Sequence, residues 1–190
     1  MGLRNTPNRY GGLAMTFHWL LAAAVIFMLW LGIAMERMGM EGRLLGMDQF
    51  AAYQLHKSIG FTILILALLR LIWRWMNPVP PLPDNLKTWE RWAAALTHVA
   101  LYLLLIAMPI IGWVMVSASP WQIPTYLYGA IELPHLTGPS EELERAMKRL
   151  HATLGFAFIA LLVLHIAAAL KHHFVMKDDT LKRMLPGSRI

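Results

Sequence analysis

One apolar stretch with a histidine near each end constrains this chain more than any other feature. It runs from Leu150 to Lys171 and is long enough to cross a bilayer as one helix. In such a helix, His151 and His165 lie about 21 Å apart along the axis and within about 40° of each other around it. One helix face would then carry two nitrogen ligands at two depths. Buried histidines can also simply bond neighbouring helices, but a polar side chain inside a bilayer is costly and is usually functional.

The composition is typical of a membrane protein. Of the 190 residues, 57% are hydrophobic and only 15% are charged, whereas soluble domains carry about 25% charged residues. The absence of cysteine excludes disulfides, iron–sulfur clusters, thiolate zinc sites and covalently attached c-type haem. The net charge of +6 is spread in short pieces between apolar runs, which indicates membrane orientation signals and no nucleic-acid partner.

Four apolar runs of bilayer-spanning length predict an all-α membrane protein with a single domain over residues 1–190. The expected spans are residues 13–35, 56–76, 92–116 and 150–171, followed by a basic tail at 172–190 that is interpreted as a helical extension into water. Short connections favour an antiparallel four-helix bundle. The sequence predicts no role for the loop at 117–149.

The distribution of Lys and Arg predicts the orientation of the bundle. The N-terminal segment, the connection between the second and third spans, and the tail are rich in basic residues, whereas acids outnumber basic residues on the other side. The positive-inside rule therefore places both termini in the cytoplasm. With this topology, four histidines on three helices fall into an inner pair, His18 and His165, and an outer pair, His56 and His151. Paired imidazoles can hold a haem iron from both faces, and b-type haem needs no covalent link.

Small residues one helical turn after the paired histidines are consistent with room for a flat macrocycle. Gly60 follows His56 and Gly155 follows His151 at this spacing, although small residues also let helices pack closely. His98, predicted at the inner level, is a further candidate, either as a competing ligand or as part of the haem environment.

Several motifs together carry a resemblance to a known family. They are MTFHWL (15–20), LHKSIGF (55–61) followed by Arg70, HVALYLLLIAMPIIGW (98–113), LHATLGF (150–156) and LHIAAALKHHFVMKDDTLKRMLP (164–186). The sequence resembles the bacterial cytochrome b561 family of di-haem membrane proteins over nearly its whole length. The resemblance implies a multi-pass inner-membrane protein with two b haems, with the inner and outer histidine pairs as axial ligands, and with electron exchange with ubiquinone near the inner haem.

Short stand-alone members of this family look like superoxide oxidases, which pass electrons from superoxide outside to ubiquinone in the membrane. For this chain we expect an outer anion patch that includes Lys57 and Arg149, unless nearby glutamates cancel it. For the inner side we expect a quinone or propionate site, unless its basic residues serve only as membrane anchors. The candidates there are Arg70, Arg74, Lys171 and His172.

Two other functional classes stay open at this point. The chain could be the haem-bearing membrane anchor of a larger dehydrogenase, with a soluble partner at its outer loops. It could instead transport metal ions or protons through haem-free histidines, although every Asp and Glu lies at or outside the expected span ends. The expected partners are the lipid bilayer, a quinone, and superoxide or another periplasmic electron donor; the sequence also leaves open a homo-oligomer.

Overall fold

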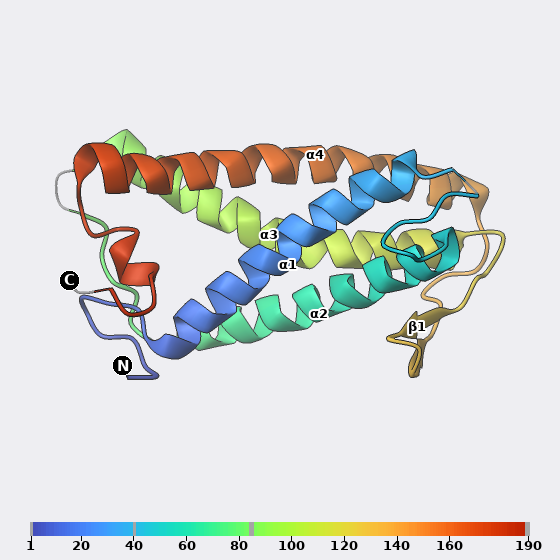
Figure 1. Ribbon diagram of the computed structural model, residues 1–190, viewed down its shortest axis with the longest axis horizontal. Coiled ribbons are helices and arrows are strands. Elements are labelled where there is room, and N and C mark those ends of the chain that lie inside the picture. The colour runs from blue at the N-terminus through green and yellow to red at the C-terminus, as the bar shows by residue number, and fades with distance from the viewer. Residues whose placement is uncertain (1, 40, 84–85, 189–190) are drawn as a thin grey trace.

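The computed structural model describes residues 2–39, 41–83 and 86–188. Four long helices run back and forth along the molecule (Figure 1): α1 (Gly12–Arg37), α2 (Gln49–Trp75), α3 (Thr88–Ala118) and α4 (Glu141–Lys171). All four have the length and hydropathy of membrane spans, which confirms the predicted all-α membrane architecture. We term the end near both termini the inner end, after the predicted orientation, and the opposite end the outer end.

Two helices begin several residues before the predicted spans, and polar caps explain where they start. The carboxylate of Asp48 accepts a hydrogen bond of 2.8 Å from the Ala51 N–H at the start of α2. The hydroxyl of Ser140 accepts one of 3.3 Å from the Leu143 N–H at the start of α4. Three glutamates in the first turn of α4 also suit the positive end of the helix dipole. The added turns of α4 occupy part of the segment 117–149, which the sequence analysis took to be a loop.

A small hairpin packs on α2 at the outer end (Figure 1). Its strands, β1 (Thr125–Leu127) and β2 (Ile131–Leu133), pair antiparallel. The Ser58 hydroxyl accepts a hydrogen bond of 2.9 Å from the Tyr128 N–H, and the Thr62 and Tyr128 hydroxyls lie 2.7 Å apart. Ser58 is about 200° around the helix from His56. The hairpin therefore satisfies polar groups on the face of α2 that points away from the histidine.

The tail does not extend into water as a helix, so that prediction is wrong. Two short elements follow α4, a π-helical turn η1 (His172–Met176) and a 3-10 turn η2 (Lys182–Met184). The chain reverses at Lys177, which has a left-handed backbone with φ of 55°. Residues 177–188, here the C-terminal strap, then cross the inner end, where the Trp19 indole donates a 2.8 Å hydrogen bond to the Met184 carbonyl. The strap thus closes the inner end of the bundle against α1.

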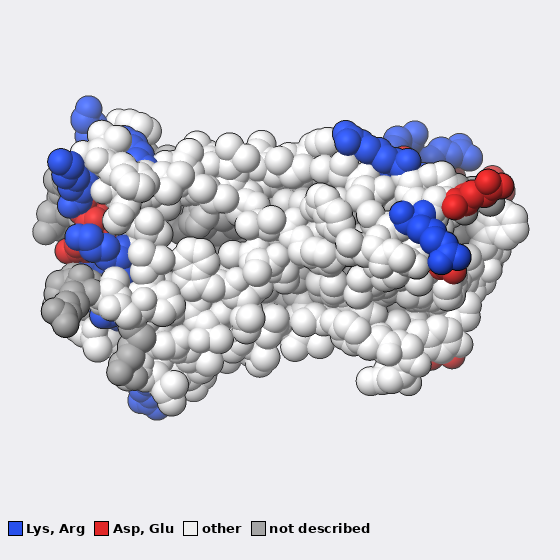
Figure 2. Space-filling view, viewed as in Figure 1, with Lys and Arg blue, Asp and Glu red and all other residues white. Residues whose placement is uncertain are grey.

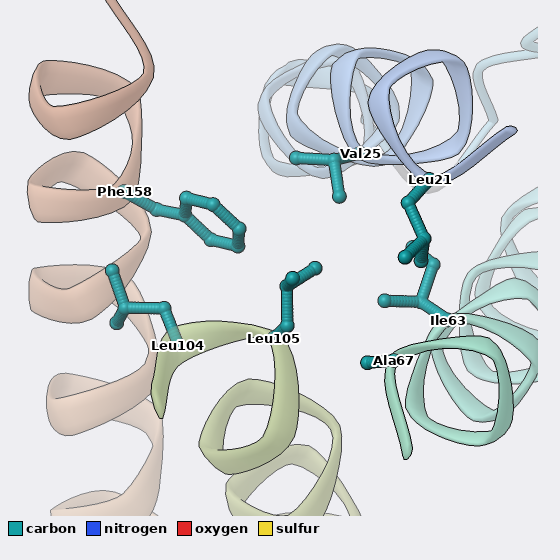
Figure 3. Close-up of a cluster of buried hydrophobic side chains, with 7 residues drawn as sticks. All are labelled: Leu21, Val25, Ile63, Ala67, Leu104, Leu105 and Phe158. Atoms are coloured by element: carbon teal, nitrogen blue, oxygen red, sulfur yellow. The ribbon is translucent and has the colours of Figure 1, made fainter. Parts of the chain in front are cut away.

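The apolar core lies in the middle of the bundle, between the two histidine levels. Side chains from all four helices meet there (Figure 3): Leu21, Val25, Ile63, Ala67, Leu104, Leu105 and Phe158. Phe158 is buried and falls midway in sequence between His151 and His165. An apolar layer therefore separates the inner from the outer histidines.

Candidate functional site

Two pairs of imidazole rings face each other across the bundle, and α4 contributes one ring to each. His18 of α1 and His165 of α4 have ring centroids 6.2 Å apart, with an angle of 65° between the ring planes. His56 of α2 and His151 of α4 have centroids 6.3 Å apart, with an angle of 64°. The structure thus brings together both pairs that the sequence predicted.

The centroid distances can be compared with those of two imidazoles that bind one metal ion from opposite sides. An imidazole nitrogen binds a first-row metal at about 2.0–2.1 Å and lies about 1.1 Å from its ring centre, so such rings have centroids about 6.2–6.4 Å apart. Both observed pairs match this separation. The geometry therefore fits a metal ion between the rings of each pair.

The ring nitrogens test the alternative of purely structural histidines. The Nδ1 atoms of His18 and His56 are buried without a hydrogen-bond partner among the residues described, whereas the His151 ring interacts with the Met108 backbone of α3. Hydrogen bonding to neighbouring helices thus does not account for these atoms, as the alternative would require. The described part of the chain also has no cluster of three or more His, Cys, Asp or Glu that could hold a metal ion. A metal held by two imidazoles alone must bring its other ligands with it, as iron does in a porphyrin.

Two glycines that the sequence analysis did not single out give the outer rings their space. A Cβ at Gly32 of α1 would lie 3.5 Å from Cε1 of His56. A Cβ at Gly112 of α3 would lie 3.4 Å from Cε1 of His151. Each outer imidazole therefore packs directly on a glycine of a neighbouring helix. Isolated glycines inside apolar helices are the signal that could have found them.

The glycines that the sequence did single out have other neighbours. A Cβ at Gly60 would lie 3.7 Å from Cε of Met28, and one at Gly155 would lie 3.9 Å from Cε of Met108. Both neighbours are ends of flexible methionine side chains, which adapt readily to the shape of an adjoining group. The expectation that these two glycines leave room for a macrocycle stays a prediction.

His98 takes part in the inner cluster in a different way from His18. Its ring centroid is 5.5 Å from that of His165, with an edge-on angle of 78°. This separation is too short for a metal ion between two imidazole nitrogens, which requires about 6.3 Å. The geometry therefore favours His18 over His98 as the partner of His165, and it leaves His98 as a close neighbour of that pair.

Two arginines of α2 supply positive charge near the inner histidines. Arg70 is half-buried, and its guanidinium lies 5.7 Å from the centre of the Tyr102 ring. It is close enough to His18 and His165 for direct charge interaction. Arg74, one turn further along, is also half-buried. Within the described residues neither arginine has a carboxylate partner, so both are suited to an anionic group that enters the bundle.

The other two candidates at the inner end already have carboxylate partners. The Lys171 ammonium lies 2.9 Å from the Glu90 carboxylate. The Nδ1 atom of His172 lies 2.6 Å from the Asp178 carboxylate, and both side chains are largely buried. Lys171 and His172 are thus already bound to carboxylates of this chain. The sequence alone did not reveal these partners.

The outer cations are arranged differently from the predicted patch. The Lys57 ammonium is half-buried and donates hydrogen bonds to the Pro124 carbonyl (3.4 Å) and the Thr125 hydroxyl (3.2 Å), so it is tied to the hairpin. Arg149 is exposed. Figure 2 shows basic side chains gathered over the outer end of α4, with acidic ones beside them. The exposed cations of α4 at this end are Arg145, Lys148 and Arg149.

The face drawn in Figure 2 is uncharged between its two ends. Figure 2 shows a broad band without acidic or basic side chains around the middle of the visible face, with charges at both ends. On this face the surface is hollowed between α1 and α4 toward the inner end. The main helix contacts run from α1 to α2, from α2 to α3 and from α3 to α4. The helices that carry His18 and His165 therefore have space between them.

Apolar spanning helices with facing imidazole pairs define a class: membrane-embedded haem proteins that transfer electrons. The sequence model of the family described as prokaryotic cytochrome b561 matches residues 9–187. The chain belongs to this family, which confirms the resemblance seen in the sequence. Four spanning helices in a member of this family make it a multi-pass protein of the bacterial inner membrane.

Three curated relatives match this chain along nearly its full length. "Cytochrome b561 homolog 2" of Escherichia coli (strain K12) is 38% identical over 99% of this chain and 97% of the relative. "Probable superoxide oxidase CybB" of Yersinia pestis is 32% identical over 96% of this chain and 98% of the relative. "Cytochrome b561 homolog 1" of Escherichia coli (strain K12) is 31% identical over 94% and 98%, respectively.

Proposed function

We propose that the chain binds two b haems and carries electrons across the membrane between them. His56 and His151 would hold the outer haem, and His18 and His165 the inner haem. The observation that carries this proposal is the pair of centroid distances, 6.2 Å and 6.3 Å, each suited to an iron between two imidazoles. Arg70 is the candidate partner for a propionate of the inner haem because it lacks a carboxylate within the described chain.

A bis-imidazole haem iron, when bound, gains and loses single electrons and has no open coordination position. The chain therefore acts on partners that exchange electrons without binding to iron. Its own side chains set the spacing of the two sites through α4, and the apolar layer around Phe158 excludes water between them. With both termini in the cytoplasm, the outer pair lies toward the periplasm and the inner pair toward the cytoplasm.

The proposed reaction is superoxide:ubiquinone oxidoreduction. Each superoxide ion gives one electron and becomes dioxygen, and two electrons with two protons convert one quinone to quinol. The exposed cations of α4 lie within the two turns before His151, where they favour the approach of a small anion. Arg149 thus belongs to this patch, whereas Lys57 is held by the hairpin. The name of the Yersinia relative, "Probable superoxide oxidase CybB", agrees with this substrate.

The proposed quinone site lies at the inner end, within reach of the inner pair. Its candidate groups are Arg70, Arg74, Lys171 and His172. Quinone reduction consumes protons, and an imidazole is suited to supply them near neutral pH.

The first experiment is a reduced-minus-oxidised spectrum of the purified protein with a haem-to-protein ratio. We expect two b haems per chain; a colourless protein, or one haem, would contradict the proposal. Superoxide and quinol are then compared as reductants in stopped-flow experiments. The triple variant R145Q/K148Q/R149Q is expected to lower the superoxide rate and its dependence on ionic strength, with quinol-driven reduction unchanged. An unchanged superoxide rate would remove the outer patch from the mechanism.

A second function, as haem-bearing anchor of a larger dehydrogenase, is favoured by one observation. The outer hairpin exposes the apolar and aromatic side chains Tyr126, Tyr128 and Ile131, with exposed fractions of 37%, 62% and 61%. Under that function the protein would purify with a soluble subunit at its outer end, and superoxide would not reduce it. Isolation without a partner, together with fast reduction by superoxide, would exclude the anchor role.

A further inference from the structure

A histidine and an aspartate form a closed turn just after α4. The Nδ1 atom of His172 and Oδ2 of Asp178 lie 2.6 Å apart, and the two side chains are only 15% and 14% exposed. The Asp178 N–H also donates to the His172 carbonyl at 3.2 Å. The left-handed backbone of Lys177 reverses the chain between them. The imidazole is thus fixed to the carboxylate by both side chain and backbone.

This turn lies on the same face of α4 as the two predicted haem ligands. His151, His165 and His172 follow one another at multiples of seven residues, and each step of seven rotates by only about 20° around a helix. His172 is about 10 Å beyond His165 along the axis, toward the inner end. The third imidazole on this face therefore occupies the next level after the inner pair.

Two neighbouring carboxylates at this end are paired with lysines. Lys171 pairs with Glu90 at 2.9 Å, and Lys182 pairs with Asp179 at 2.9 Å. In the part of the chain that the structure describes, His172 is the only histidine paired with a carboxylate. The pair therefore stands apart from the surface ion pairs around it.

The ionisation of Asp178 decides which nitrogen of the imidazole carries the bonded hydrogen. Burial raises the pKa of Asp178, but hydrogen bonds from Thr180 and His172 outweigh it and hold the pKa below 3.8. An ionised carboxylate only accepts hydrogen bonds, so Nδ1 of His172 must be the donor. The remaining nitrogen, Nε2, is then the one at which a proton can be gained or lost.

We propose that Asp178 is a positioning residue that keeps the hydrogen of His172 on Nδ1, so that Nε2 delivers a proton consumed in quinone reduction. The inference rests on the proposed quinone reduction at the inner end. In each of two such transfers the Nε2–H bond breaks and an O–H bond forms on a quinone oxygen, while two electrons in total reach the quinone from the outer donor. His172 is left neutral with its Nδ1–H in place, and it takes its next proton from water at the inner surface.

The test compares four single variants of the haem-loaded protein, together with the double variant D178N/H172Q, in lipid nanodiscs. The single variants are D178N, which removes the charge; D178E, which restores it one methylene further away; H172Q; and the control D179N, which changes the adjacent aspartate. The first readout is the 15N chemical shifts of the His172 ring in the fully reduced, diamagnetic protein, assigned by difference from H172Q. The second is reoxidation of the reduced haems by ubiquinone-1. Haem content and reduction by the outer donor show that each variant is intact.

We expect the wild-type shifts to report a protonated Nδ1, and D178N to populate the other tautomer. Reoxidation by the quinone should fall about tenfold in D178N and in H172Q, with no further loss in the double variant. D178E should recover most of the rate, and D179N should match the wild type. A wild-type ring protonated on Nε2 alone, or a D178N loss that is equally large in the H172Q background, would overturn this inference alone. A wild-type protein whose reduced haems ubiquinone-1 does not reoxidise would overturn the proposed function and the inference with it.

Discussion

Gly112 offers a selective way to perturb the outer histidine pair, because the His151 ring packs where a side chain would be. A Cβ there would lie 3.4 Å from Cε1 and 3.7 Å from Nδ1 of this ring. Alanine therefore reaches ordinary contact and needs a shift of a few tenths of an ångström at most. Valine extends a further bond length of about 1.5 Å, which brings a methyl carbon within about 2–3 Å of the ring. We expect G112V to displace His151 and G112A to be tolerated.

The size of the effect follows from the cost of overpacking. Extra methyl groups in a filled core typically cost about 1–3 kcal/mol. If the whole of this free-energy cost falls on haem binding at the outer site, the haem affinity of that site falls by about 5- to 150-fold. The inner pair lies about 21 Å further along α4 and should be unaffected.

The assay is the haem-to-protein ratio by pyridine haemochrome, together with a redox titration followed at the α band. For G112V we expect the ratio to fall toward one and a single titrating component to remain. G39V is the matched control, because nothing lies within 4 Å of a Cβ at Gly39. If G112V keeps two haems with both components at wild-type potentials, His151 is not a ligand packed on Gly112.

Three other changes test separate parts of the molecule. H98A is expected to keep both haems while H18A loses the inner one, measured by the same spectra; equal losses would contradict the assignment made from the centroid distances. F158A leaves a cavity in the apolar layer and should lower the free energy of unfolding by about 3–5 kcal/mol in a detergent titration, and a change below about 1 kcal/mol would place Phe158 outside the core. Because the pKa of Asp178 is held below 3.8, its contribution to stability is complete above that pH and is lost as the pH falls through the lower folded-state value. The protection factors of the amides in residues 177–188, corrected for the intrinsic exchange rate at each pH, should therefore be high at pH 5 and should fall on acidification below pH 3.8. In D178N they should be low at every pH, and high protection in D178N would refute the anchoring role.

Local patterns were sufficient to predict four spanning helices and which histidine rings meet. Hydropathy over about twenty residues identifies a spanning helix, and the 3.6-residue period places His151 and His165 on one face. Topology then sets the depth of His18 and His56 without knowledge of packing. The structure brings these rings together in the predicted pairs, whereas their role as iron ligands stays a prediction until haem is measured.

The remaining features depend on contacts between distant segments, which local patterns do not reveal. Lys57 is read from sequence as a free cation, but its partners in the hairpin are 67 and 68 residues away. A signal was present in Ser58 and Thr62, because polar residues one turn apart on a spanning helix require partners. The pair of His172 and Asp178 was hidden for another reason: it needs a π-helical turn and a left-handed residue, neither of which the sequence pattern indicates.

The hydrogen bond between Trp19 and Met184 has a consequence for the order in which the parts of the fold assemble during synthesis. These residues are 165 positions apart, so α1 is synthesised long before the C-terminal strap that binds it. The Arg9 guanidinium donates a hydrogen bond to the carbonyl of Leu185, which is 176 positions away, so this bond also forms late. The C-terminal strap can therefore bind α1 at the inner end only after α4 has been synthesised.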